Sequence, residues 1–187
     1  MTDGVASFVD ELARHHLDAA YNLGRWLLGN EQDAADAVHD AYLRAARSAN
    51  TYAGGNARAW WLTIVRNCCF ARLAARTKEQ RNVSIDPSAE SAQAWLPQTD
   101  SDEAMDGIYA VQRRAHLTRA MRELAPEFRE VLILREIEEL SYREIADVLQ
   151  APIGTVMSRL ARGRAMLQKA LHGNGQSTSR IEAMHGL

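Results

Sequence analysis

The sequence has few of the residues that interrupt helices, with eleven glycines and four prolines among its 187 residues. This scarcity favours helices over the many short strands and turns of a β-protein. The two cysteines, Cys68 and Cys69, are neighbours, so a disulfide framework is excluded and a reducing cytoplasm is the expected setting. No apolar run approaches the roughly 18 residues of a membrane span. The N-terminal MTDGVASFVDEL is acidic, which argues against a signal peptide.

The net charge of −2 conceals segments of strong and opposite charge. Residues 1–50 hold four basic and eight acidic side chains, whereas residues 51–83 hold six basic side chains and one acidic. Residues 84–111 hold six acidic side chains and no basic one, and residues 141–187 hold six basic and three acidic. Two basic segments separated by an acidic one predict two contacts with a polyanion, joined by a segment that DNA repels.

Apolar residues repeat with the period of an amphipathic helix along most of the chain. In the first half, the period predicts helices over residues 8–28, 33–47 and 57–76, with a loop at residues 48–56. Packed together, these helices can bury a shared core. The residues expected to face this core from the third helix are Trp61, Ile64, Val65, Cys68 and Leu73. Because adjacent helical residues point to different faces, we expect one of Cys68 and Cys69 to be buried.

Residues 84–111 lose this periodicity and contain two prolines and several serines, which predicts an extended or only locally ordered linker. The helical pattern resumes at about residue 112 and is interrupted at Ala125-Pro126. The predicted fold is therefore all-α, with two small helical domains joined by a flexible acidic linker and followed by a disordered tail. The corresponding ranges are 1–83 for the first domain, 84–111 for the linker, 112–172 for the second domain and 173–187 for the tail.

The end of the second domain carries the most informative pattern. Ser141 and Glu144 have the spacing of a capping box, so a helix is expected to begin there. Pro152 and Gly154 predict a tight turn, and residues 151–172 contain four basic side chains and no acidic one. A short helix, a turn and a basic helix form a helix-turn-helix suited to the major groove of DNA. The residues expected to contact DNA are Thr155, Ser158, Arg159 and Arg162, together with Arg143, which could equally be only exposed.

These segments resemble the bacterial RNA polymerase sigma factors of the extracytoplasmic-function (ECF) group. LSYREIADVLQAPIGTVMSRLARGRAML resembles the helix-turn-helix of sigma region 4, which reads the minus-thirty-five element. DAADAVHDAYLRAARS is similar to the polymerase-binding helix of sigma region 2, and NARAWWLTIVRNCCFARLAAR to its promoter-melting helix. The resemblance covers residues 8–83 and 112–172. It implies an alternative sigma factor, without catalysis or cofactor of its own, that directs promoter-specific transcription initiation.

The resemblance also implies partners and sites. The partners are the core RNA polymerase (the clamp of its largest subunit and its flap region), promoter DNA and an anti-sigma factor, without insertion into a membrane. The polymerase-binding residues would be Asp33, Asp36, Val38, His39, Asp40 and Leu43. The residues for the melted minus-ten element would be Tyr52, Asn56, Trp60, Arg66 and Asn67. Aromatic side chains interleaved with basic ones suit single-stranded DNA, because stacking contributes about 1–3 kcal/mol per base beside phosphate neutralisation. We expect Trp61 in the core and Trp60 partly exposed.

The sequence departs from the family pattern at three places. His39 stands where many relatives have glutamine, and Met157 and Ala161 stand where relatives often carry larger polar, basic or aromatic side chains. The loop SANTYAGGN differs from commoner versions. The promoter sequence of a relative therefore cannot be transferred to this chain.

Three alternatives remain at the level of the sequence. A helix-turn-helix regulator that is not a sigma factor would have a similar C-terminal segment but a sensory or dimerising N-terminal domain. An enzyme would require a metal-binding spacing, a phosphate-binding loop or a nucleophile elbow, and the sequence contains none of them, although the Cys68-Cys69 pair leaves a thiol redox switch open. A helical bundle that binds only proteins would leave both basic segments without a role.

Overall fold

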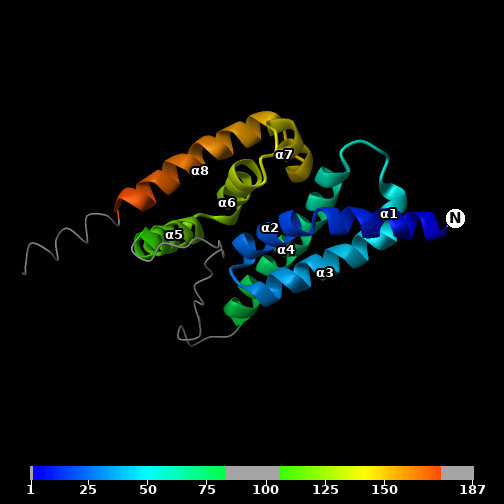
Figure 1. Ribbon diagram of the computed structural model, residues 1–187, viewed down its shortest axis with the longest axis horizontal. Helices are drawn as coiled ribbons and strands as arrows, with labels where there is room; N and C mark the ends of the chain where they lie inside the picture. The colour runs from blue at the N-terminus through cyan, green and yellow to red at the C-terminus, as the bar shows by residue number, and fades with distance from the viewer. Residues whose placement is uncertain (1, 83–105, 174–187) are drawn as a thin grey trace, which may run out of the picture.

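The computed structural model describes residues 2–82 and 106–173, and both ranges are built of helices without a strand (Figure 1). The predicted tail beyond Gly173 and residues 84–105 of the predicted linker lie outside the described residues. The prediction of an all-α fold is confirmed. None of the described helices combines the length and the apolar character needed to cross a membrane. The elements in chain order are α1 (Thr2–His15), α2 (Leu17–Leu28), α3 (Glu31–Ser48), η1 (Ala49–Thr51), α4 (Ala57–Asn82), α5 (Asp106–Glu123), α6 (Pro126–Leu132), the π-helical η2 (Ile133–Ile137), α7 (Tyr142–Leu149) and α8 (Ile153–Gly173).

The first half, α1 to α4, is a bundle in which α2, α3 and α4 pack on one another and α1 lies against α3 and α4 (Figure 1). Its core includes Leu23, Leu27 and Trp61, and the complete burial of Trp61 confirms the prediction made for it from the sequence. The turn between α2 and α3 has Gly29 in the left-handed conformation, and the side chain of Asn30 caps α3 by accepting a hydrogen bond from the backbone of Asp33.

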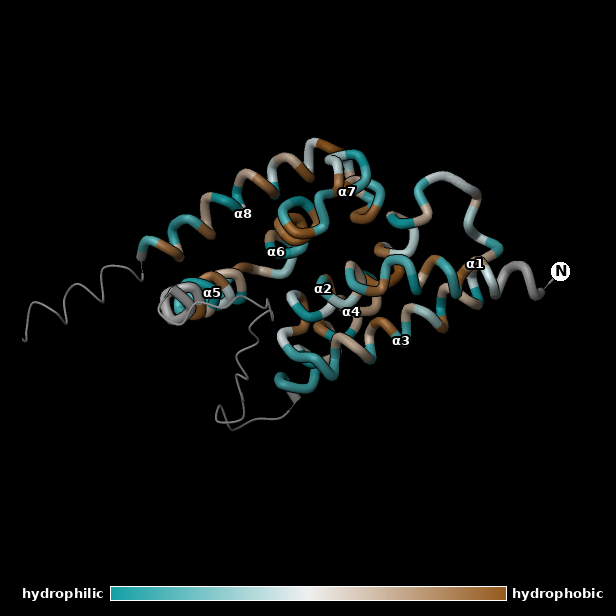
Figure 2. The backbone as a smooth tube through the Cα atoms, in the orientation of Figure 1, coloured by the Kyte–Doolittle hydropathy of each residue, from teal (hydrophilic) through white to brown (hydrophobic). Residues whose placement is uncertain are grey.

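The second half, α5 to α8, is built around the packing of α6 on α8. Val131, Ile133, Ile145 and Leu160 are buried in it, and Figure 2 shows hydrophobic residues, in brown, along α6 and α7. Gly163 allows α8 to approach α6 closely, because a Cβ atom there would lie 3.3 Å from both the Phe128 carbonyl and the Leu132 side chain.

Several predicted boundaries are wrong. The first predicted helix is two, because His16 leaves the helical conformation (φ −117°, ψ 25°) between α1 and α2. Residues 106–111, predicted as linker, belong to α5, since Asp106 suits a helix N-terminus and no proline lies between it and Pro126. The helix α4 extends to Asn82, and α8 begins two residues before the predicted Thr155.

The two cysteines are both buried, where the sequence predicts one. The helix α4 is covered by α3 and by α2 on different sides, so neighbouring positions of α4 are both enclosed. Burial raises the pKa of the Cys68 thiol and raises the pKa of the Cys69 thiol to about 12. Because the thiolate is the reactive form, the structure disfavours a thiol redox switch in the folded chain.

We expect both thiols of the native chain to react slowly with iodoacetamide at pH 8 and rapidly once guanidinium chloride has unfolded the protein. Mass spectrometry at timed intervals measures the two rates. A thiol that is alkylated in the native chain as fast as in the unfolded chain would contradict the enclosed position of α4.

The capping box predicted at the start of α7 is present. The Ser141 hydroxyl accepts a hydrogen bond from the Glu144 backbone at 3.3 Å, and the Glu144 carboxylate accepts one from the Ser141 backbone at 2.8 Å. These contacts, led by the Ser141 N–H, lower the pKa of Glu144. They satisfy backbone N–H groups that the first turn of α7 would leave unpaired.

Substituting Ser141→Ala should lower the free energy of unfolding by about 0.5–2 kcal/mol, because it removes this cap. Urea denaturation followed by circular dichroism measures the change. The control is Ser158→Ala, inside α8, where the hydroxyl only donates to the carbonyl of Thr155 and alanine favours the helix. Equal losses in the two variants would show that the cap does not contribute.

The two halves are in contact along α4 and α7 and along α2 and α6, and their buried apolar residues form one continuous cluster. The buried guanidinium of Arg129, in α6, donates to the carbonyls of Met121, Arg122 and Leu124 at the end of α5. It also donates to the carbonyls of Trp26 and Leu27 near the end of α2. A single side chain therefore satisfies helix-end carbonyls from both halves.

Candidate nucleic-acid and polymerase interfaces

The outer face of α8 carries the residues predicted to read duplex DNA. Met157, Ser158, Ala161 and Arg162 are exposed, and Thr155 is half-buried in the first turn. Arg162 forms no ion pair with any residue that the structure describes, so its guanidinium is available to a ligand. Arg143, on the neighbouring helix α7, is also exposed and has no ion pair among the described residues.

Arg159 differs from its neighbours on α8. Its Nη1 lies 3.3 Å from Oε1 of Glu130 in α6, and 30 % of its side chain is exposed. Arg164 likewise pairs with Glu136 at 2.6 Å, on the exposed surface. The three arginines of α8 thus divide into Arg162, which has no ion pair among the described residues, and Arg159 and Arg164, which contact glutamates of the α6–η2 segment.

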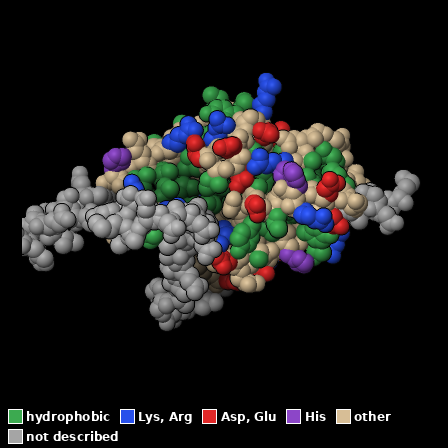
Figure 3. Space-filling model, viewed as in Figure 1, with side chains coloured by type: hydrophobic (Ala, Val, Ile, Leu, Met, Phe, Trp, Pro, Cys, Tyr) green, Lys and Arg blue, Asp and Glu red, His purple; other side chains and the backbone are tan. Residues whose placement is uncertain are grey.

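The helix α3 presents acidic side chains toward α4. Arg72 lies 2.7 Å from Asp40 and 3.7 Å from Asp36, and Arg76 pairs with Asp33. His39 and Leu43 are exposed on the same helix. On the face shown in Figure 3, acidic and basic side chains lie next to one another over the middle of the molecule.

Val38 is not part of this surface. It is only 8 % exposed and belongs to the buried side of α3 with Ala34, Ala37, Ala41 and Ala45. The spacing of these five residues turns Val38 into the core of the first half, and its expected role as a polymerase contact stays a prediction.

The aromatic side chains at the loop and the start of α4 form a cluster. The Tyr52 ring stacks on Phe8 of α1 with centroids 5.1 Å apart, and Trp60 lies 5.5 Å from Tyr52 and 6.4 Å from Phe8. The Tyr52 hydroxyl donates to the carbonyl of Gly55. Trp60 is partly exposed, as predicted. Phe8 was missed as a member of this site, because its position in the sequence is typical of an ordinary core residue of an amphipathic helix.

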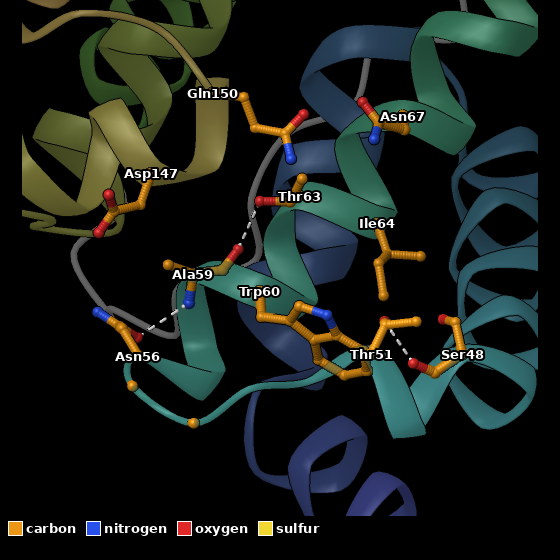
Figure 4. Close-up of a pocket in the computed structure, with 12 residues that line it drawn as sticks. Ser48, Thr51, Asn56, Ala59, Trp60, Thr63, Ile64, Asn67, Asp147 and Gln150 are labelled. Atoms are coloured by element: carbon orange, nitrogen blue, oxygen red, sulfur yellow. Dashed lines mark hydrogen bonds between the residues drawn. The ribbon is translucent and has the colours of Figure 1, made fainter.

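A cavity of about 530 Å³ lies beside this cluster (Figure 4). One wall comes from the loop and α4, and includes Asn56, Trp60 and Asn67 of the predicted minus-ten residues. The other wall comes from Asp147 of α7 and from Gln150, the residue that caps the C-terminus of this helix. Asn56 accepts a hydrogen bond from the Ala59 backbone at 2.9 Å, which caps α4 and fixes this wall.

Three glutamates of the second half contact this side of the first half. Glu130, which is completely buried, accepts two hydrogen bonds from Arg66, at 2.6 and 3.1 Å. Glu138 pairs with Arg58 at 3.0 Å, and Glu144 accepts a hydrogen bond from Asn56 at 2.9 Å. We call Glu130, Glu138 and Glu144 the interdomain glutamates.

Burial raises the pKa of Glu130, and the two neighbouring arginines, Arg66 and Arg159, oppose this shift. The interdomain glutamates have no local signal in the sequence, because their partners lie 64 to 88 residues away along the chain. Among the described residues, no group of three or more His, Cys, Asp or Glu side chains is arranged to hold a metal ion.

Two family models match the chain, and they match in the order that the sequence analysis expects. Residues 12–79 match the model of sigma-70 region 2, and residues 114–167 match that of sigma-70 region 4. The match to region 2 disfavours a helix-turn-helix regulator that is not a sigma factor, since such a regulator would not contain region 2.

Named relatives give the same assignment. The chain is 34 % identical over 171 residues to the ECF RNA polymerase sigma factor SigE of Mycolicibacterium smegmatis, covering 91 % of this chain and 64 % of that relative. It is 34 % identical over 148 residues to the RNA polymerase sigma-H factor of Pseudomonas aeruginosa, covering 75 % and 74 % of the two chains. It is 32 % identical over 163 residues to the ECF sigma factor SigM of Mycobacterium tuberculosis, covering 87 % and 76 %.

Two solved structures share the fold. The sigma factor RpoE of Bartonella quintana, solved with the anti-sigma factor NepR, has a TM-score of 0.68 at 24 % identity over 87 % of this chain and 96 % of that one. CnrH, solved with the cytosolic domain of CnrY, has a TM-score of 0.61 at 22 % identity over 92 % and 95 %. From its matches to regions 2 and 4 and to these relatives, the chain belongs to the ECF group of RNA polymerase sigma factors.

Proposed function

We propose that this chain is an alternative sigma factor that acts in the cytoplasm, binds core RNA polymerase and directs initiation at a specific set of promoters. Catalysis stays with the polymerase, and the chain supplies recognition. The observation that carries the proposal is the match to both sigma regions, combined with the exposed Arg162 on α8 and with an aromatic-basic surface, formed by Tyr52, Trp60 and Arg66, at the start of α4.

The two halves divide the work. The first domain, residues 1–83, binds the polymerase clamp and the melted minus-ten element. The second domain begins with α5 at Asp106 and ends at about residue 172, and it reads the minus-thirty-five element as a duplex beside the polymerase flap. The acidic segment between them is a linker, and it avoids DNA because its charge is negative.

The proposed polymerase contact is the exposed surface of α3, including its border with α4, where Arg72 and Arg76 pair with its aspartates. Asp36, His39, Asp40 and Leu43 are at least partly exposed on this helix, and Asp33 borders them through its pair with Arg76. An exposed leucine among acidic side chains combines an apolar anchor with charge that selects a basic partner.

The proposed minus-ten site is the cavity beside α4. Trp60 and Tyr52 offer ring faces or edges for stacking, and Asn56 and Asn67 offer amide groups that can read the edge of a base. Arg66 supplies charge for the phosphate backbone, because a guanidinium binds phosphate in a fork geometry.

The proposed minus-thirty-five site is the outer face of α8 with the first turn of α7. Ser158 and Arg162 face outward, Thr155 lies at the N-terminus of α8, and Arg143 flanks them. Arg159 remains in the proposed set as a phosphate contact, because 30 % of its side chain is exposed beside its pair with Glu130.

Control by an anti-sigma factor is part of the proposal. The two solved structures that share this fold are complexes, RpoE with the anti-sigma factor NepR and CnrH with the cytosolic domain of CnrY. These complexes support a similar partner for this chain.

The test of the function is reconstitution. The purified chain is added to bacterial core polymerase on fragmented genomic DNA from its source, and the transcription start sites are sequenced. The proposal expects specific starts that share two spaced upstream elements. Core polymerase that neither binds the chain nor gains specific starts from it would overturn the proposal.

Arg162→Ala should weaken binding of the reconstituted holoenzyme to its promoter by about 1–3 kcal/mol, because the free guanidinium contacts a base or phosphate. Binding to core polymerase should not change. Gel-shift titration of promoter DNA and co-purification with core polymerase measure the two properties. The matched control is Arg164→Ala, on the same helix but paired with Glu136, and an equal loss in both variants would exclude a specific role of Arg162.

Asp36→Ala combined with Leu43→Ala should reduce co-purification with core polymerase at least several-fold, since the pair removes one charge and one exposed apolar side chain from the proposed contact. The control is Leu17→Ala with Asp18→Ala, an equivalent exposed pair on α2. Affinity capture of core polymerase at matched protein concentration is the measurement. Undiminished capture by the α3 variant would remove α3 from the polymerase interface.

A further inference from the structure

We infer that the contact between the two halves is a closed state of the chain in which the interdomain glutamates take the place of single-stranded DNA phosphates. The inference rests on the proposed function, because it uses the minus-ten residues assigned there. It goes further by assigning a role to Glu130, Glu138 and Glu144, which belong to the second half but contact the DNA-facing side of the first.

Glu130 carries most of the argument. Its buried carboxylate accepts from Nε of Arg66 at 2.6 Å and from Nη2 at 3.1 Å. A carboxylate and a phosphate offer a guanidinium the same paired oxygen acceptors. While Arg66 donates both of these hydrogen bonds to Glu130, it cannot donate them to DNA.

The other contacts block the same surface. Asn56 donates its amide to Glu144, Arg58 pairs with Glu138, and Thr63 on α4 donates to the carbonyl of Val148 at 3.3 Å. The helix α7 thereby forms the second wall of the cavity beside Trp60 and Asn67 (Figure 4).

The chemistry of this second wall opposes nucleic acid. Asp147 is a residue of this wall, and its negative charge beside the cavity repels a DNA backbone. A single strand therefore meets occupied donors and an unfavourable charge at the proposed minus-ten site.

The closed state leaves the duplex-reading face open. Arg143, Ser158 and Arg162 stay exposed on α7 and α8 in the closed chain. The closed state is therefore selective, because it covers the surface for single-stranded DNA and, of the proposed duplex contacts, engages only Arg159, through Glu130.

The contact is built so that it can open. When the halves separate, Glu130 keeps Arg159, and Glu144 keeps its hydrogen bond from the Ser141 backbone, since these partners lie in the same half. Arg58 and Arg66 no longer contact Glu138 and Glu130, so both guanidinium groups can bind phosphates. A ligand that binds only the open chain shifts the equilibrium toward it.

The test compares the wild-type chain with a double variant that carries both Glu130→Gln and Glu138→Gln. The probe is a fluorescein-labelled single-stranded 20-nucleotide DNA of mixed sequence, titrated by fluorescence anisotropy, with a duplex of the same sequence alongside. The combined variant should bind the single strand about tenfold more tightly, because the competent fraction of the chain rises. Its affinity for the duplex should rise less, because Arg159 is the one residue of the proposed duplex site that pairs with these glutamates.

The matched control is Glu123→Gln with Glu136→Gln, which removes the same charge from exposed positions away from the interface. It separates opening of the chain from the general effect of net charge on DNA binding. If Glu130→Gln lowers the helix content seen by circular dichroism, Glu138→Gln with Asp147→Asn serves as the second interface variant.

A second measurement does not depend on DNA. The substitutions Ala46→Cys and Ala165→Cys introduce one exposed labelling site in each half. Nitroxide labels at these sites report the distance between the halves by pulsed electron paramagnetic resonance. The buried native thiols stay unlabelled because their burial suppresses reaction. The closed state predicts one narrow distance in the wild-type background and a longer, broader distribution in the interface variant.

The inference fails if the interface variants match the control in single-strand affinity and keep the wild-type distance. This outcome would leave the sigma function intact, because reconstituted transcription tests that function separately. Conversely, opening of the interface variants without any specific transcription from the wild-type chain would support the closed state and count against the proposed function.

Discussion

Two consecutive side chains of α6, Arg129 and Glu130, determine how the two halves of the chain fit together. Arg129 donates to five carbonyls at the ends of α2 and α5, and Glu130 accepts from arginines of α4 and α8. Removing one partner of a buried charge costs about 3–5 kcal/mol. The positions of these helices are therefore coupled, since each must keep its donor or carbonyl within reach of α6.

The two side chains differ in how much of their bonding crosses the interface. Arg129 keeps three carbonyls of its own half when the halves separate, namely Met121, Arg122 and Leu124. Glu130 keeps one arginine. The α5–α6 junction and the packing of α6 on α8 thus remain satisfied in either arrangement, whereas α2 and α4 exchange protein partners for solvent or ligand. The fold of each half is consequently more firmly determined than the contact between them.

Local patterns predicted the elements of this fold well. The capping box at Ser141, the break at Pro126 and the buried Trp61 follow from spacing and from residue types with a fixed conformational preference. The errors also have physical causes. The acidic composition of residues 106–111 resembles that of a linker, although these residues begin α5, and Val38 shares the helical spacing of the buried alanines of α3.

The contacts between the halves could not be predicted in this way. Arg66 and Glu130 are 64 residues apart, and neither lies in a pattern that points to the other. A basic side chain can bind either a DNA phosphate or a carboxylate of the protein, and the sequence does not distinguish these two partners. Only the three-dimensional structure shows that Arg58 and Arg66 bind carboxylates of the same chain.

This double use of one surface has a consequence for a sigma factor. An open aromatic-basic surface would bind single-stranded nucleic acid with little regard to sequence, because stacking and phosphate contacts tolerate every base. A chain that covers this surface with its own glutamates exposes it when a partner holds the two halves apart. A polymerase that binds the halves at separate sites is such a partner, and it selects the open state in proportion to its preference for that state. Polymerase binding would then break the ion pairs that hold the free chain closed. The surface for single-stranded DNA would become available only in the polymerase complex, where the promoter is melted.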